Sequence, residues 1–245
     1  MARALNGINA SPPASEDGHA RRVRSTKERI LDAAVEAFER DGYSPATIEA
    51  IAGAAGVAPA SVYNHFASKA GVAQALAERA LRVHDDYVAA AWALDSSPLE
   101  RLIAAAGATL AFARERRTLF QAISLSYLSP LGLFPAKTSA ARAIDARRQE
   151  QLGRIIANLD AAVAADELRP IDTLSMAHFV IASWAAVLTM YARPGSPADP
   201  AATLAAGIRA MIQGVATEAT VTRDGRLRAR YERALDRSGL TSPGA

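Results

Sequence analysis

Apolar residues recur at steps of three and four along most of the 245-residue chain, and no stretch alternates convincingly with period two. Steps of three and four place side chains on one face of a helix, whereas period two is typical of a strand. The composition is 50% hydrophobic but only 6% aromatic. The balance is mostly Ala and Leu, which enter helices at low cost. The sequence therefore predicts an all-α protein.

Three short helices are expected near the N-terminus. Residues 25–28, Ser-Thr-Lys-Glu, have the spacing of a capping box and predict a first helix over residues 25–41. Thr47 is expected to cap a second helix that ends at Gly56, and Pro59 to open a third. A tight turn containing glycine joins the last two, which is the layout of a helix-turn-helix unit.

Longer helical patterns follow and predict a second, larger helical domain. They cover residues 70–94, 98–115, 117–128, 138–166, 171–192 and 199–219, separated by turn-forming residues at 129–132, 169–170 and 194–197. The expected organisation is a disordered basic arm (1–24), a helix-turn-helix domain (25–70), a helical domain (71–222) and an exposed basic tail (223–245).

Several classes of protein do not fit this chain. It has no cysteine, which excludes disulfides, thiolate metal sites and a cysteine nucleophile. No phosphate loop, dinucleotide fingerprint or hydrolase elbow occurs. His84, Asp85 and Asp86 are adjacent, and side chains one or two positions apart diverge around a helix. We expect no enzyme, no metal and no cofactor.

A membrane protein is also disfavoured. The most apolar run, residues 176–192, is shorter than the roughly 20 residues of a bilayer span and lacks flanking basic anchors. No apolar stretch near the N-terminus suits a signal peptide. We expect a cytoplasmic protein that has no membrane partner.

The run from Thr47 to Lys69, TIEAIAGAAGVAPASVYNHFASK, resembles the signature of the TetR family of bacterial transcriptional regulators. The match includes the capping threonine, Ala-Gly-Val at the turn, Tyr-x-His-Phe, and a lysine three residues later. Ala58 departs from the pattern, because a capping serine is common there. The resemblance covers residues 25–70 and implies a regulator that binds a double-stranded DNA operator.

The third helix is expected to enter the major groove and to present its N-terminal residues to base edges. Asn64 alone could make a bidentate contact, for which adenine is the natural target. The other expected base readers are Pro59, Ala60 and Ser61. The resemblance implies phosphate contacts by Thr47, Tyr63, His65 and Lys69, although His65 could instead only pack.

Two basic segments lie outside this run. Arg24 and Lys27, with Arg21 and Arg22, directly precede or begin the first predicted helix and could follow the DNA backbone or simply be solvated. The arginines after residue 223 are expected to be solvated, because the family places its C-terminus away from the duplex.

The resemblance implies that the second domain binds a small effector and forms a homodimer. Aromatic and Met side chains adapt to apolar ligands, so a small apolar or aromatic molecule is expected. Each candidate, taken alone, is more often plain core. The candidates for lining the pocket are Leu110, Phe112, Leu119, Phe120, Ile123, Tyr127, Met176, His178 and Trp184, with Ser124 and Thr109 as further polar groups.

The helix expected over 171–192 carries two apolar stripes, whereas a lone surface helix needs one. Internal packing or pairing with a second copy could account for the extra stripe; we favour a two-fold dimer. The interface residues expected on this helix and the next are Ile181, Leu188, Leu204, Ile208, Met211, Ile212 and Val215.

The expected function is therefore a ligand-responsive repressor that binds a pseudo-palindromic operator as a dimer and is released by a small molecule. The alternatives are a helical small-molecule-binding module, or an activator with no effector-driven release from DNA.

Overall fold

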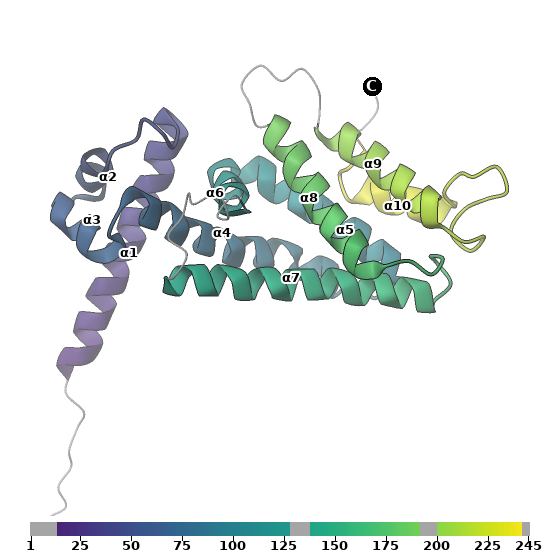
Figure 1. Ribbon diagram of the computed structural model, residues 1–245, viewed down its shortest axis with the longest axis horizontal. Helices are drawn as coiled ribbons and strands as arrows, with labels where there is room; N and C mark the ends of the chain where they lie inside the picture. The colour runs from purple at the N-terminus through teal and green to yellow at the C-terminus, as the bar shows by residue number, and fades with distance from the viewer. Residues whose placement is uncertain (1–13, 128–137, 192–199, 242–245) are drawn as a thin grey trace, which may run out of the picture. The chain divides into compact units, whose positions relative to one another are not determined.

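The computed structural model describes residues 14–127, 138–191 and 200–241, with the side chains of 14–22, Leu125 and Tyr127 excepted. The described chain is helical and contains no strand, only two isolated bridges, which confirms the all-α prediction (Figure 1). The expected turns at 129–132 and 194–197 lie outside the described residues. The helices are α1 (Ala14–Asp41), α2 (Ile48–Ala55), α3 (Pro59–Phe66), α4 (Lys69–Trp92), α5 (Pro98–Glu115), α6 (Arg117–Tyr127), α7 (Ser139–Ala164), α8 (Thr173–Tyr191), α9 (Pro200–Val215) and α10 (Ala229–Arg237).

The chain divides into two compact units after Val72, close to the predicted boundary at residue 70. In the first unit, α1 packs on α2 and α2 on α3. Its core is made by side chains that are almost wholly buried. They come from all three helices and include Ile30 and Ala34 of α1, Ile51 and Ala52 of α2, and Val62 of α3.

The first helix begins earlier than predicted. It starts at Ala14, so Ser25 lies inside the helix and caps nothing. A capping box requires a serine in non-helical conformation, and the spacing alone does not ensure it. Residues 14–24, expected to belong to a disordered arm, are instead helical.

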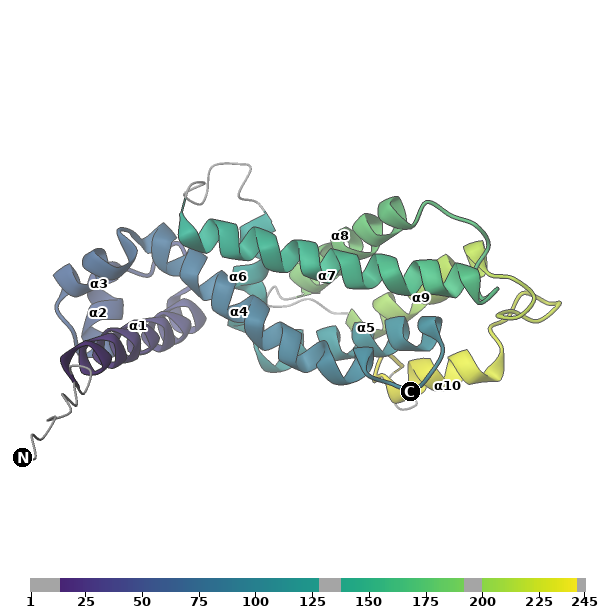
Figure 2. The ribbon, with the colours of Figure 1, turned by 90° about the horizontal axis from the view of Figure 1, so that it is seen from below.

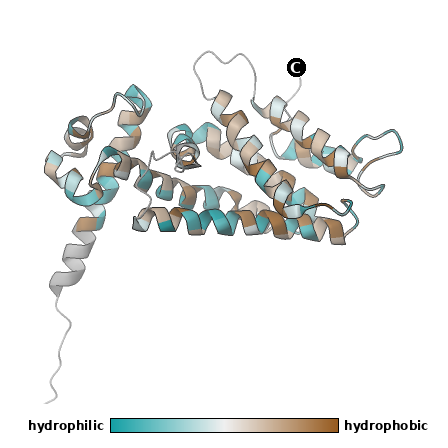
Figure 3. Cartoon of the chain, viewed as in Figure 1, coloured by the Kyte–Doolittle hydropathy of each residue, from teal (hydrophilic) through white to brown (hydrophobic). Residues whose placement is uncertain are grey.

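The second unit is built on α5 and α7, which pack on each other. α7 also packs on α8, and α8 on α9 (Figures 1 and 2). Ser97 forms a complete capping box with Glu100 at the start of α5, where its spacing does coincide with an extended residue. Figure 3 shows apolar residues along most of α8 and α9, whereas α7 carries many polar ones.

The C-terminal segment belongs to this core rather than forming an exposed tail. Tyr231 and Leu235 of α10 are fully buried, and α10 packs on α5. A Cβ on Gly107 would lie 2.2 Å from the carbonyl oxygen of Ser238, so the close approach of α5 to the end of α10 requires glycine. The spacing of four between Leu227, Tyr231 and Leu235 signals a buried face that the many arginines obscure.

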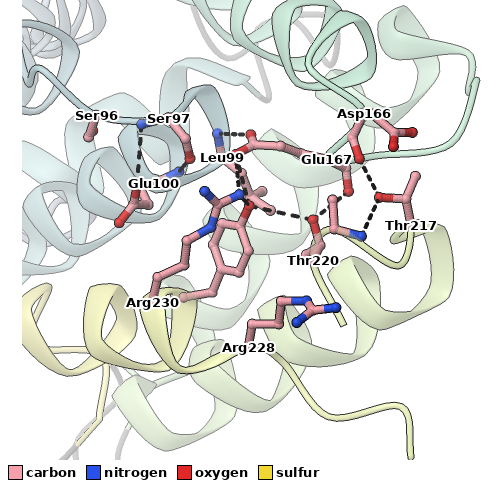
Figure 4. Close-up of polar contacts among 12 residues, drawn as sticks. Ser96, Ser97, Leu99, Glu100, Asp166, Glu167, Thr217, Thr220, Arg228 and Arg230 are labelled. Carbon is pink, nitrogen blue, oxygen red and sulfur yellow. Dashed lines mark hydrogen bonds and ion pairs between the residues drawn. The ribbon is translucent and has the colours of Figure 1, made fainter. Parts of the chain in front are cut away.

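A buried carboxylate fixes the same segment (Figure 4). Glu167, which is 3% exposed, accepts hydrogen bonds from the Leu99 backbone N–H at 3.0 Å and the Tyr231 hydroxyl at 2.8 Å. It also pairs with Arg230 at 3.1 Å. The Thr220 hydroxyl donates to the Glu167 carbonyl at 2.7 Å. These contacts tie the start of α5 and the start of α10 to one side chain.

Candidate nucleic-acid interface and ligand cavity

The turn between α2 and α3 forms as the sequence predicts. The Thr47 hydroxyl accepts a hydrogen bond from the Ala50 N–H at 3.1 Å and caps α2. Gly56 ends α2 in the left-handed conformation at φ 62°. Pro59 occupies the first turn of α3, and Ala58 caps it without a side-chain hydrogen bond. Each end of the turn is thus set by local residues.

One side of α3 is free of other contacts within the first unit. Val62 is the buried residue of the helix. Tyr63 is 48% exposed and Asn64 is exposed as well. Pro59 and Ala60 are exposed, and Ser61 and His65 are partly exposed. The ring of His65 also makes an edge contact with Phe66, at 6.2 Å between centroids. The predicted base readers therefore all lie at accessible positions of α3, Pro59, Ala60 and Ser61 in its first turn and Asn64 further along.

Lys69, predicted to contact a phosphate, makes hydrogen bonds within the first unit. Its ammonium donates to three backbone carbonyls, those of Tyr43 at 3.0 Å, Ser44 at 2.8 Å and Ala46 at 3.0 Å. An ammonium has three hydrogens. All three are therefore engaged, and Lys69 fastens the α1–α2 loop rather than presenting a free donor to a phosphate.

The other expected backbone contacts stay accessible. Arg24 and Lys27 are exposed on α1, and Thr47 is exposed at the start of α2. Arg29 is a basic residue whose role we did not predict. Its guanidinium donates to the carbonyls of Ala55 and Gly56, the latter at 3.1 Å, and so caps the C-terminus of α2. A cation near a helix C-terminus is favourable, but its sequence position on α1 gives no sign of this partner.

The second unit contains a cavity of about 200 Å³ lined by residues from α4 to α9. Four of the predicted pocket residues line it: Phe120, Ile123, Met176 and Trp184. The side chain of Tyr127 lies outside the described residues. Both tryptophans of the chain, Trp92 and Trp184, line the cavity. The structure thus brings together part of the predicted set.

The remaining predicted pocket residues lie elsewhere. Leu110, Phe112 and Leu119 are buried but do not line the cavity. Phe112 packs edge-on against the ring of His84, with centroids 5.3 Å apart. His178 is exposed on α8 and hydrogen-bonds the Leu174 carbonyl at 3.0 Å.

One end of the cavity is polar. His84 Nε2 lies 3.0 Å from the Thr109 hydroxyl, and His84 Nδ1 lies 3.2 Å from the Gln151 side-chain nitrogen. Gln151 also donates to Asp85 at 3.2 Å and so bridges the two neighbours. Burial lowers the pKa of His84 to about 4; Asp85 opposes this shift and Arg154 adds to it. The imidazole is therefore neutral at pH 7. Sequence reasoning named Thr109 as a polar group of the pocket but did not connect it with His84 or Gln151, because the three residues lie on different helices.

The residues expected at a dimer interface face the interior. Of the seven, Ile181, Leu188, Ile208, Met211, Ile212 and Val215 line the cavity, and Leu204 is buried. The opposite side of α8 carries two large exposed apolar side chains, Phe179 (59% exposed) and Met190 (63% exposed). Leu174, in the first turn, is 51% exposed. Met176 and Val180 of the predicted second stripe also line the cavity, whereas Met190 of that stripe is exposed.

Comparisons with known proteins agree with this architecture. The family model described as "Bacterial regulatory proteins, tetR family" matches residues 30–76, which span α2 and α3. The HTH-type transcriptional regulator SrpR of Pseudomonas putida is 46% identical over 54 residues. Residues 30–76 therefore form a DNA-binding region of the TetR family. The match covers 22% of this chain and 25% of SrpR, so the chain spans a quarter of that relative's length.

TetR-family structures share the whole fold. CprB from S. coelicolor superposes with a TM-score of 0.63 at 24% identity, covering 90% of this chain and all of CprB. The ketosteroid transcriptional regulator KstR2 of Mycobacterium tuberculosis gives a TM-score of 0.61 at 22% identity, covering 78% of this chain and 95% of KstR2. These identities establish similarity of fold.

Proposed function

We propose that this TetR-family protein is a cytoplasmic, ligand-responsive transcriptional repressor that binds a pseudo-palindromic operator as a homodimer. The observation that carries the proposal is the accessible face of α3, where Pro59, Ala60, Ser61 and Asn64 lie together behind a capped turn. A helix of this kind enters the major groove, and a dimer places two such helices about 34–36 Å apart.

DNA binding is tested by fluorescence anisotropy on the region upstream of the gene. Binding should be specific and should fall steeply with salt, because phosphate contacts release counterions. A dissociation constant no tighter than that for random duplex would contradict the proposal. The alternative, a helical small-molecule-binding module, predicts this lack of specific DNA binding together with a cavity that still binds a ligand.

Asn64 is proposed to read a base. Asn64→Ala should cost about 1–3 kcal/mol on the operator and relax specificity at one position. Lys27→Ala is the matched control, because loss of an exposed cation should weaken all sequences alike. If both variants lose affinity equally on all sequences, Asn64 does not read bases.

The second copy is proposed to cover the exposed side of α8 and α9. Phe179 and Met190 are exposed on α8, and the small residues Ala206, Ala210 and Gly214 are exposed on α9, which packs on α8. Small residues permit a close approach of the partner helix, and exposed apolar patches of this kind mark interfaces. By length and composition alone, α8 could also span a membrane. Its residues Ala177, Trp184 and Leu188 are instead buried against the rest of the unit.

Light scattering on a size-exclusion column tests the dimer. Phe179→Asp should yield monomers at micromolar concentration, because a carboxylate would be buried without a partner. Leu94→Asp, at an apolar residue that is 45% exposed on another part of the unit, is the control and should remain dimeric. A monomeric unmodified protein would contradict the proposal.

The cavity is the proposed effector site. A bound effector should release the protein from its operator, whereas an activator with no effector-driven release should keep its DNA affinity when the cavity is filled. Operator anisotropy with and without a cavity ligand separates the two.

A further inference from the structure

The walls of the cavity carry no Asp, Glu, Lys or Arg among the described residues. Its polar side chains, other than the two indoles, are His84, Thr109, Ser124 and Gln151. An ion entering such a site would lose its hydration without meeting an opposite charge, which is costly. A neutral molecule meets no such penalty.

The hydrogen bonds of the polar cluster are directional. The Thr109 hydroxyl donates to the Ala105 carbonyl at 2.9 Å, so it must accept from His84, whose hydrogen therefore lies on Nε2. His84 Nδ1 is then an acceptor and is filled by the Gln151 amide. The second hydrogen of that amide goes to Asp85.

Ser124, from α6, is arranged in the same way. Its hydroxyl donates to the Phe120 carbonyl at 3.1 Å and accepts from Thr189 at 3.3 Å. A hydroxyl oxygen has two lone pairs. The hydrogens of Thr109 and Ser124 are therefore engaged within the protein, while each oxygen keeps one free acceptor position.

We infer that the cavity selects a neutral, largely apolar ligand that carries a hydrogen-bond donor, a hydroxyl or an N–H, and that the Thr109 oxygen accepts this hydrogen. The inference rests on the proposed function, because it specifies the effector of the same cavity. His84 supports it as a neutral ring that orders Thr109 and does not offer a cation to an anionic ligand.

Charge selection is tested with two fluorescent probes that differ by one sulfonate, N-phenylnaphthylamine and anilinonaphthalene sulfonate. The neutral probe should bind, and the sulfonate should bind on the order of 100-fold more weakly. Equal affinities would overturn the neutral-ligand claim and leave the cavity as an effector site. If neither probe binds, the proposed effector site fails as well.

Donor selection is tested by displacing the neutral probe with dodecanol or its methyl ether, which has no donor. The alcohol should compete about three- to tenfold better, as one hydrogen bond would provide. Thr109→Val keeps the shape of the side chain and removes the acceptor. The advantage in affinity of the alcohol over the ether should then fall to the difference that their apolar contacts alone produce. A ratio that is the same in both proteins would overturn the role of Thr109.

The site itself is verified by filling it. Ala106 lines the cavity, and Ala106→Phe should abolish binding of the neutral probe. Ala157 is exposed on α7, and Ala157→Phe should leave binding unchanged. Probe binding that survives Ala106→Phe would place the probe elsewhere and overturn the inference.

Discussion

Lys69 holds Tyr43 in two ways: its ammonium donates to the Tyr43 carbonyl at 3.0 Å and lies 4.9 Å from the centroid of the Tyr43 ring. Residues 26 positions apart in sequence are thereby joined across the first unit. Because all three hydrogens of the ammonium are engaged by carbonyls, we expect Lys69 to contribute to DNA binding by positioning the loop that leads into α2.

This arrangement predicts how Lys69→Met will behave. The variant should destabilise the first unit by about 1–3 kcal/mol, because three carbonyls, two of them in partly buried hydrogen bonds, lose a charged donor. The slope of log affinity against log salt should stay unchanged at temperatures where the unit is folded. Lys27→Ala should do the opposite, keeping stability and lowering the slope by about 1. A reduced slope for Lys69→Met would show that the lysine neutralises a phosphate after all.

Gly71 provides a second test of the first unit. A Cβ at this position would lie 1.8 Å from the carbonyl oxygen of Phe66, which is backbone and cannot move aside. Gly71→Ala should therefore destabilise strongly, by about 3 kcal/mol or more. At Gly53, in α2, a Cβ would meet nothing within 4 Å, so Gly53→Ala should stabilise by about 0.5–1 kcal/mol. Urea unfolding measures the change in the free energy of unfolding for both variants. Equal changes would contradict the close approach of Gly71 to the Phe66 carbonyl.

Glu167 is expected to control the stability of the second unit. Glu167→Ala removes a buried acceptor that serves Leu99, Arg230 and Tyr231, and should cost about 2–3 kcal/mol. Arg226→Ala breaks the ion pair with Asp224 on a side chain that is 84% exposed, and should change stability by less than about 0.5 kcal/mol. Thermal unfolding that shows both variants alike would refute the role of Glu167.

His84 predicts a pH dependence of stability. Its pKa in the folded protein, about 4, lies below the ordinary 6.5, so protons bind better to the unfolded chain. The contribution of His84 to the free energy of unfolding should be fully present above pH 6.5 and should decrease as the pH drops toward 4. The total loss from this group should be at most about 3 kcal/mol. Burial sets this shift of the pKa, which the charged neighbour Asp85 opposes and Arg154 increases.

His84→Gln isolates that contribution. Hydrogen bonds hold the pKa values of carboxylates such as Asp172 and Asp224 below the ordinary range, so these groups also make stability depend on pH. Subtracting the unfolding free energy of the variant from that of the unmodified protein at each pH cancels their contribution. The difference should decline between pH 6.5 and 4. A flat difference would mean that His84 titrates normally.

Most helices could be predicted because their limits are local. Thr47, Gly56 and Pro59 act on the backbone beside them, and those boundaries are confirmed. The start of α1 could not be found in this way. Helix-forming residues precede Ser25, and a serine inside a helix shows the same spacing to Glu28 as a serine that caps one.

The candidate sites depended on longer distances. Periodicity shows that α8 has two apolar faces, but which face lines the cavity is decided by packing, and the sequence could not show that Ile181 and Leu188 lie there. The partners of Lys69 lie at least 23 residues away, and those of His84 on α5 and α7. Hydrogen bonds between such distant residues leave no periodic trace in the sequence.

The lining of the cavity by Trp92 and Trp184 has a practical consequence. Since the chain has only these two indoles, its tryptophan emission originates entirely from the walls of the proposed effector site. Binding of a colourless molecule in the cavity should therefore change the tryptophan emission of the unmodified protein, so that binding can be measured without any label.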